Sequence, residues 1–286
     1  MIQRRAPMAW ALLIFVAAHL LAPTLVAAPK TAGAPAASPS GHPFRVYDML
    51  FYRNKPDLSR LGLLPGNGDG NFWAGEDRAR DSVPAAAIRR EITRFRDYRG
   101  LFYVDIEEWP TYNVPDAQIT ENIAKLVQVA DIVRETAPGL QFGFYAIMPE
   151  NVYWPLVDGT PDQLRRWRES ARRTEVLARK VDVIMPSLYT FYDSPSDRAG
   201  WEKWARIVLT EARRYGKPVY PLLWPQFHNS NEKLGGHPVP GDYWRMELDT
   251  VRRYADGVVL WGGDSTDWDE NAEWWRQTKQ FLATLK

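Results

Sequence analysis

Apolar segments of strand length alternate with long amphipathic stretches from Phe44 to the end of the chain. Six segments predict buried strands: "FRVYDML", "LFYVDIE", "LQFGFYAIM", "VDVIMPSLY", "PVYPLLW" and "GVVLWGG". Between them, stretches such as "ITENIAKLVQVADIVRETAP" and "WEKWARIVLTEARRYG" place apolar residues at helical spacing, with Arg and Glu on the other face. This alternation is typical of a parallel α/β architecture.

The sequence favours one kind of parallel α/β fold. It contains neither GxGxxG nor GxxxxGK[ST], the motifs that support a nucleotide-binding doubly wound sheet. We therefore expect residues 43–286 to form a TIM-like (β/α) barrel of seven or eight strands. One strand is expected to be irregular or missing, because residues 53–82 predict mostly loop.

The amino terminus predicts export to the periplasm or the medium. Residues 1–28 join the basic "MIQRR" to an apolar run that ends in small residues, as in a signal peptide. The run is also long enough to stay as a membrane anchor. Residues 29–42 predict a disordered Pro/Ala/Ser linker. The chain has no cysteine, which excludes disulfides and thiol chemistry.

The charge balance narrows the expected partners. The chain has 36 basic and 35 acidic residues, which gives no electrostatic support for binding nucleic acid. His228 and His237 do not have metal-ligand spacing, and we expect neither a metal nor a cofactor. We expect a monomer without membrane contact beyond the amino-terminal anchor. The 13 Trp and 13 Tyr suit both core packing and stacking on sugar rings.

Two acids lie at alternate positions of the segment "LFYVDIEEWPTY", residues 101–112. In an extended chain Tyr103, Asp105 and Glu107 share one face. Burying two carboxyl groups together is costly unless partners or a shared proton compensate, so the pattern indicates chemistry. The alternative is a structural site in which helix arginines form ion pairs with both acids.

Aromatic residues are predicted beside this acid pair. In a (β/α) barrel the active site lies at the carboxyl ends of the strands. Tyr145, Tyr189, Trp224 and Trp261 fall within or at the ends of four other predicted strands. Acids ringed by Tyr and Trp are what a glycosidase requires, although Tyr145, Trp224 and Trp261 also fit a packed core.

Four motifs in sequential order carry a resemblance to a known family. They are "VDIEEW", "FGFYAIMP", "IMPSLY" and "GVVLWGG". Across residues 99–285 the chain resembles the hyaluronidases of glycoside hydrolase family 56. It departs from the animal members by lacking cysteine and by having Pro110 where they have an arginine after the acid-motif tryptophan.

The resemblance implies a role for each matching residue. Glu107 would be the catalytic acid and base, and Asp105 would position the acetamido group of the substrate. Tyr145, Tyr189 and Trp261 would line the reacting subsite. In addition, we expect Trp224 to be a platform for an outer sugar.

The spacing of the acids agrees with a substrate-assisted mechanism. Carboxyl groups one residue apart are poorly placed to flank a glycosidic bond, so a 2-acetamido group would supply the nucleophile. The prediction is a retaining hydrolase of an N-acetylhexosamine-containing, hyaluronan-like polysaccharide. Arg198, Arg213 and Lys233 are candidates to bind an anionic substrate. The alternatives are a chitinase-like or peptidoglycan-directed hexosaminidase and a non-catalytic carbohydrate-binding barrel.

Overall fold

The computed structural model describes residues 41–69, 82–263 and 266–286. The predicted leader and all but the last two residues of the predicted linker lie outside these ranges. Within the described ranges, no helix combines the length and the apolar character that crossing a membrane requires.

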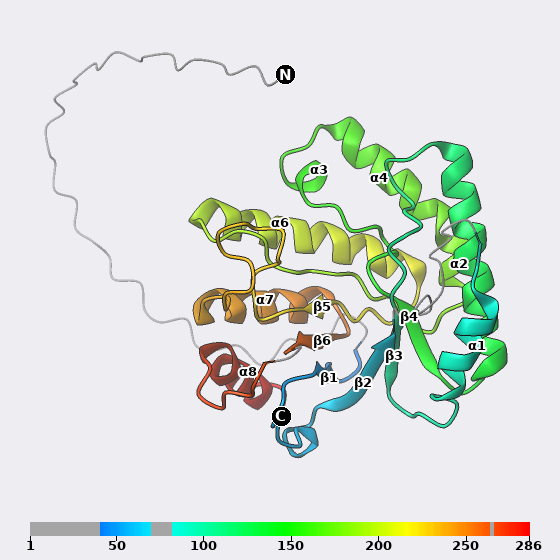
Figure 1. The fold of residues 1–286 in the computed structure, drawn as a ribbon. Helices are drawn as coiled ribbons and strands as arrows, with labels where there is room; N and C mark the ends of the chain where they lie inside the picture. Colours follow the sequence, from blue (N-terminus) through cyan, green and yellow to red (C-terminus); the bar gives the residue numbers. More distant parts are fainter. Residues whose placement is uncertain (1–40, 70–81, 264–265) are drawn as a thin grey trace, which may run out of the picture. The chain divides into compact units, whose positions relative to one another are not determined.

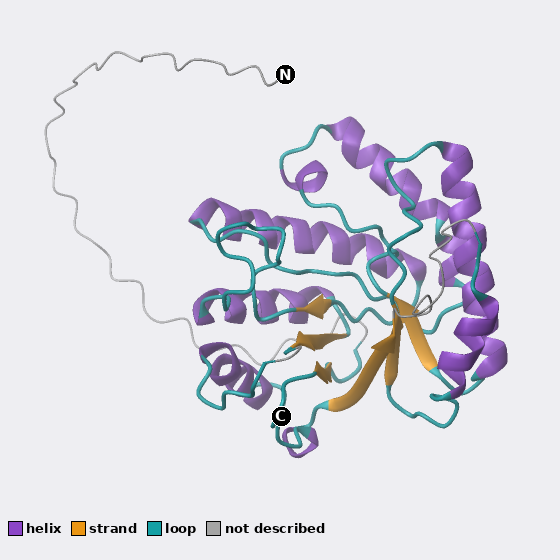
Figure 2. Cartoon of the chain, in the orientation of Figure 1, coloured by secondary structure: helices purple, strands orange, loops and turns teal. Residues whose placement is uncertain are grey.

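Six strands in the described residues form one parallel sheet in the order β4-β3-β2-β1-β6-β5 (Figures 1 and 2). The first strand pairs with the last along its full length, from Arg45 opposite Gly257 to Leu50 opposite Gly262. The sheet is curled into a half-barrel, and the predicted parallel α/β architecture is confirmed. The strands are β1 Arg45–Leu50, β2 Leu64–Asp69, β3 Leu101–Val104, β4 Gln141–Phe144, β5 Leu222–Leu223 and β6 Gly257–Gly262.

Helices alternate with the strands and lie outside the sheet (Figure 1). Two of them begin with a capping box and a proline in the first turn: Thr160 caps α4 and Ser194 caps α6. The helices are α1 Ala85–Thr93, α2 Asp116–Thr136, α3 Trp154–Val157, α4 Pro161–Arg173, α5 Glu175–Ala178, α6 Pro195–Ala212, α7 Gly241–Tyr254 and α8 Glu273–Ala283, with single 3-10 turns η1 Ser59–Leu61 and η2 Arg213–Tyr215.

Strand β2 lies within residues 53–82, for which mostly loop and no strand was predicted; residues 70–81 of that range lie outside the described residues. Its sequence "LPGNGD" has no β-branched residue and two glycines, so no strand pattern was visible. The backbone nevertheless pairs with β1 on one side and with β3 on the other. Pairing on both sides stabilises a strand that its side chains do not specify.

The predicted strand over residues 181–189 is not a regular strand. Pro186 lacks an N–H, and Pro218 and Pro221 interrupt the neighbouring segment in the same way. Isolated parallel bridges remain on both sides, from Met185 to Tyr145 and from Ser187 to Leu222. The described residues therefore hold six strands, whereas seven or eight were predicted.

The two faces of the sheet build two separate clusters. Side chains such as Phe102 and Val104 point outward and pack under the helices. The inward residues form a smaller cluster inside the half-barrel, around Tyr47, Met185 and Val259. At one end, the partly buried rings of Tyr103, Trp224 and Trp261 pack against this inner cluster.

Candidate active site

The acid pair lies where strand β3 ends. Phe102, Val104 and Ile106 are fully buried, whereas Tyr103 and Asp105 are half-buried and Glu107 is exposed. The predicted alternation of faces is confirmed. Because β3 ends at Val104, both acids follow its last residue at the carboxyl edge of the sheet.

The inward residues of several strands enclose one hollow of about 240 Å³. All six residues predicted for the site border it, although their catalytic and binding roles remain predictions. Three further residues border it that were not predicted. The lining consists of Tyr103, Asp105, Glu107, Tyr145, Tyr189, Trp224, His228, Asn229 and Trp261.

Four rings form a wall of the hollow. Tyr189 stacks on Trp261 with centroids 5.5 Å apart and planes inclined by 28°, and on His228 at 6.2 Å and 26°. Trp224 stands across these rings, at 82° to Trp261 and 89° to His228. Flat apolar faces in this arrangement suit the apolar face of a pyranose ring.

Hydrogen bonds fix the aromatic side chains of the hollow. Trp261 Nε1 donates to the Tyr103 hydroxyl at 3.2 Å, and the Tyr145 hydroxyl donates to Ser187 Oγ at 3.1 Å. Burial raises the pKa of Tyr145 and of Tyr189 far above the usual tyrosine value. Both phenols therefore stay protonated and able to donate at any physiological pH.

Both acids have raised pKa values. Burial, followed by the charges of Glu107 and Glu108, raises the pKa of Asp105 to about 7. Burial and the charge of Glu108 raise the pKa of Glu107. The repulsion between the two acids acts on the pKa of Asp105, the more deeply buried of the two carboxyl groups. One oxygen of Asp105, Oδ1, is buried and has no hydrogen-bond partner in the described part of the chain.

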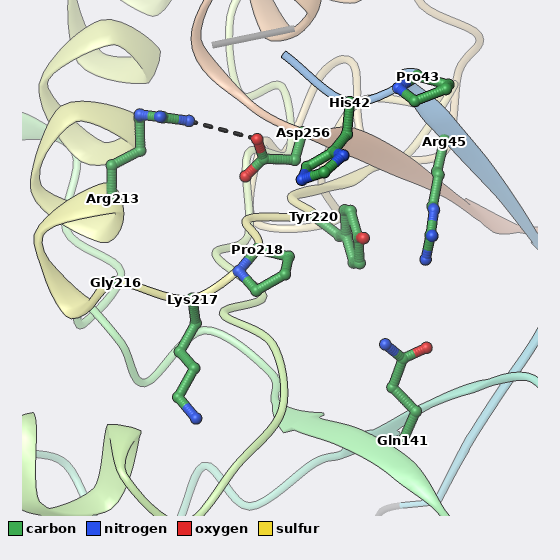
Figure 3. Close-up of a pocket in the computed structure, with 10 residues that line it drawn as sticks. All are labelled: His42, Pro43, Arg45, Gln141, Arg213, Gly216, Lys217, Pro218, Tyr220 and Asp256. Atoms are coloured by element: carbon green, nitrogen blue, oxygen red, sulfur yellow. Dashed lines mark hydrogen bonds and ion pairs between the residues drawn. The ribbon is translucent and has the colours of Figure 1, made fainter. Parts of the chain in front are cut away.

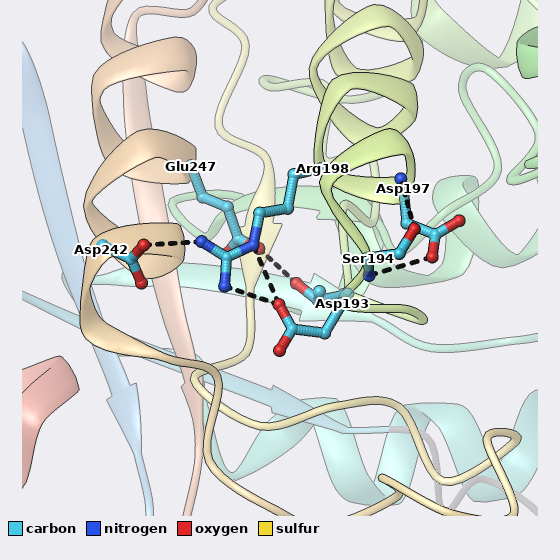
Figure 4. Close-up of polar contacts among 7 residues, drawn as sticks. Asp193, Ser194, Asp197, Arg198, Asp242 and Glu247 are labelled. Atoms are coloured by element: carbon cyan, nitrogen blue, oxygen red, sulfur yellow. Dashed lines mark hydrogen bonds and ion pairs between the residues drawn. The ribbon is translucent and has the colours of Figure 1, made fainter.

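The ion pairs of the described residues do not include either acid. Arg198, a candidate to line the groove, pairs with Asp193 and Asp242, at 2.7 Å in each case (Figure 4). Arg213 pairs with Asp256 at 3.4 Å. The alternative of a structural ion-pair site therefore finds no support in the contacts of these arginines.

Three lining residues were not assigned to the site from sequence. Tyr103 has the same parity in the strand as Asp105, and that signal could have identified it. His228 and Asn229 follow the end of β5 by a few residues, which is the only sequence signal they carry. His228 Nδ1 accepts the Ser230 N–H at 3.1 Å, so the proton of the neutral ring lies on Nε2, and burial lowers the pKa of this imidazole.

A second cavity of about 470 Å³ lies at the end of the sheet where the strands begin (Figure 3). Residues that begin or precede strands line it, among them Arg45, Gln141, Tyr220 and Asp256. The Arg213–Asp256 ion pair borders this cavity and not the acid pair. Arg213 is therefore not part of the hollow at the carboxyl ends.

The solved structures with a similar fold include two of one protein. The fold is similar to that of bee venom hyaluronidase. One crystal structure of that protein aligns with a TM-score of 0.60 at 14% identity and covers 85% of this chain and 100% of the other. Its complex with a hyaluronic acid tetramer aligns with a TM-score of 0.57 at 14% identity, covering 85% and 96%. At this identity the similarity shows the fold alone.

Comparisons of the sequence give no family assignment. No family model matches the chain, and no curated protein matches it.

Proposed function

We propose that this chain is a retaining glycoside hydrolase that cleaves an N-acetylhexosamine-containing polysaccharide with the help of the substrate's own acetamido group. One observation carries the proposal: the Asp105 and Glu107 side chains share a hollow that is otherwise walled by five Tyr and Trp rings, one His and one Asn. Acids with raised pKa values inside an aromatic site fit proton transfer to a glycosidic oxygen.

The unpaired oxygen of Asp105 suits the acetamido N–H. Asp105 Oδ1 is a buried acceptor without a donor among the described residues, and such a group is costly until a ligand supplies one. A hydrogen bond from an amide N–H favours the ionised carboxyl and lowers the pKa of Asp105. The charge that then forms on Asp105 raises the pKa of Glu107. Substrate binding thus leaves the proton on Glu107, where the reaction needs it.

The chemistry then follows in two steps. The acetamido oxygen attacks the anomeric carbon and forms a cyclic oxazolinium, while the glycosidic C–O bond breaks and Glu107 protonates the leaving oxygen. Water next attacks the anomeric carbon from the opposite face. The bond between the anomeric carbon and the acetamido oxygen breaks as Glu107 takes a proton from the water. Two inversions give net retention, and Glu107 ends protonated as it began.

Activity of the Glu107→Gln variant tests this assignment. We expect kcat to fall by about 10²–10⁴-fold, the usual contribution of a general acid and base, with no change in thermal stability beyond a few degrees. Asp105→Asn should reduce cleavage of acetamido substrates strongly. The assay is the release of reducing ends from hyaluronan, chondroitin, chitin oligomers and peptidoglycan strands. Undiminished cleavage by Glu107→Gln would contradict the mechanism, whereas binding without cleavage by the wild type would favour a carbohydrate-binding barrel.

The proposal extends to the fold. We propose that residues 182–190 act as a seventh, irregular strand that closes the half-barrel. In support, Ala146 N donates to Met185 O at 3.0 Å, and Leu188 N donates to Leu222 O at 3.0 Å. A closed barrel would hold the inward rings of Tyr189 and Trp224 at fixed positions.

A further inference from the structure

Carboxyl groups are crowded at the end of β3. Asp105 and Glu107 line the hollow, and the charge of Glu108 acts on both. Glu150 is half-buried nearby, with Oε2 accepting the Thr111 N–H at 3.0 Å, and its pKa responds to the charge of Glu107. Carboxylates that repel one another give the hollow a negative potential.

The three cationic side chains that were candidates to bind an anionic substrate do not offset this negative potential. Arg198 pairs with two aspartates (Figure 4). Its guanidinium group also lies 4.7 Å from the centre of the Tyr243 ring. Arg213 borders the cavity at the end of the sheet where the strands begin (Figure 3). Neither of them, nor Lys233, is among the residues that line the hollow. A uronic acid polymer would therefore bring carboxylates to a site that already repels them.

The remaining lining favours positive charge. The faces of tryptophan rings attract ammonium groups through their quadrupoles, and the partly buried Trp224 and Trp261 line the same hollow as the acids. His228 adds no positive charge near neutral pH, because burial lowers its pKa. Acidic groups and aromatic faces in one hollow are the chemistry that recognises an amine.

We infer that the hollow binds a partially de-N-acetylated amino-sugar polymer, in which free amino groups lie beside N-acetylated units. We also infer that it discriminates against polymers that contain uronic acids. The inference rests on the proposed function. The unit that reacts needs its acetamido group, whereas the flanking units can carry an ammonium group that offsets the negative potential. The substrate class is thus cationic, in contrast to hyaluronan.

The test compares three oligosaccharides of equal length: fully N-acetylated β-1,4-glucosamine, the same oligomer partially de-N-acetylated, and hyaluronan. Calorimetric binding is measured with Glu107→Gln, which retains Asp105, Glu108 and Glu150. We expect the amine-bearing oligomer to bind at least about five-fold more tightly than the neutral one, and hyaluronan to bind most weakly. The differences should shrink when salt is raised. Equal binding of hyaluronan and the neutral oligomer, or no gain from the amines, would overturn the inference.

A charge placed on the lining provides the matched control. Asn229 is exposed and borders the hollow, so Asn229→Arg should weaken binding of the amine-bearing oligomer and strengthen that of hyaluronan, each by about two- to five-fold. Gln128→Arg adds the same charge at an exposed position of helix α2 that does not line the hollow, and it should change neither. An unchanged ranking in Asn229→Arg would contradict the inference.

Cleavage by the wild type separates this inference from the proposed function. Binding in the expected order without cleavage of any oligomer would refute the hydrolase while supporting the charge preference. Cleavage that favours hyaluronan would do the reverse.

Discussion

Gly68 controls the position of Tyr103 in the hollow. A Cβ added at Gly68 would lie closer than 3.0 Å to three atoms of the Tyr103 ring, a separation that Cβ atoms essentially never adopt. The ring cannot turn away freely, because its hydroxyl accepts the Trp261 Nε1–H at 3.2 Å and Tyr145 lies on another side at 6.2 Å. Gly68→Ala should therefore displace Tyr103 and break the bond to Trp261.

The expected loss of stability follows from two opposing effects. Overpacking a filled site costs about 1–3 kcal/mol, and the restricted unfolded chain returns about 0.4–1 kcal/mol. The middle of each range gives a net loss of about 1.3 kcal/mol, or about 3–5 °C in melting temperature for a domain of this size. Cleavage should fall about ten-fold in kcat/KM, because the displaced ring enters the hollow.

Melting curves and tryptophan fluorescence of four variants test this reasoning. Gly139→Ala is the control, since a Cβ there meets only Arg99 Nη1, at an ordinary 3.7 Å, and we expect no loss of stability. Adding Gly68→Ala to Tyr103→Ala should cost nothing, because the ring it would overlap is gone. A Gly68→Ala variant as stable as wild type, or an equal loss in both backgrounds, would refute the argument.

Three further predictions concern other parts of the site and its support. Folding raises the pKa of Asp105 from 3.8 to about 7, so its contribution to the free energy of unfolding is complete below about pH 4 and is lost as the pH rises through 7. Within this window the free energy of unfolding should fall by about 1.4 kcal/mol per pH unit. Asp105→Asn should reduce this pH dependence in urea titrations. Glu247 is fully buried and accepts a hydrogen bond from the Thr190 hydroxyl, and burial raises its pKa well above the usual range. Because the neutral side chain is the stable form, Glu247→Gln should lower the free energy of unfolding by under about 1 kcal/mol in urea titrations. Glu247→Ala leaves a cavity and should lower it by about 2–4 kcal/mol. Trp261→Phe keeps a ring but loses the donor to Tyr103, and we expect kcat/KM to fall about two- to ten-fold in steady-state assays; an unchanged value would count against the bond as a support of the site.

Most of the site could be predicted because apolar and polar residues alternate along β3 and the residues that follow it. Apolar Phe102 and Val104 specify the outward face, so Asp105 and Glu107 had to share the inward one. The rule that parallel strands present their carboxyl ends at one edge then brought Tyr189 and Trp261 to the same hollow. These inferences need only local pattern and topology.

The parts that escaped prediction depend on contacts between distant segments. Strand β2 exists because β1 and β3 pair with it, and nothing in "LPGNGD" specifies that pairing. His228 enters the hollow through a loop whose course depends on bonds such as His228 N to Thr190 O at 2.7 Å. The position of Arg198 could not be predicted for the same reason, because one of the two aspartates that pair with it, Asp242, lies in helix α7.

The outer strands of the six-stranded sheet are shielded from other molecules. A free strand edge presents unpaired N–H and C=O groups, and these can recruit a second chain and seed aggregation. Here the N–H of Ala146, just after β4, donates to Met185 O, and the N–H of Leu222 in β5 donates to Pro186 O. The irregular segment 182–190 therefore pairs with both outer strands, β4 and β5. A chain without disulfides thus gains protection from edge-to-edge association, and the amide hydrogens of Ala146 and Leu222 should exchange with solvent as slowly as those of the central strands.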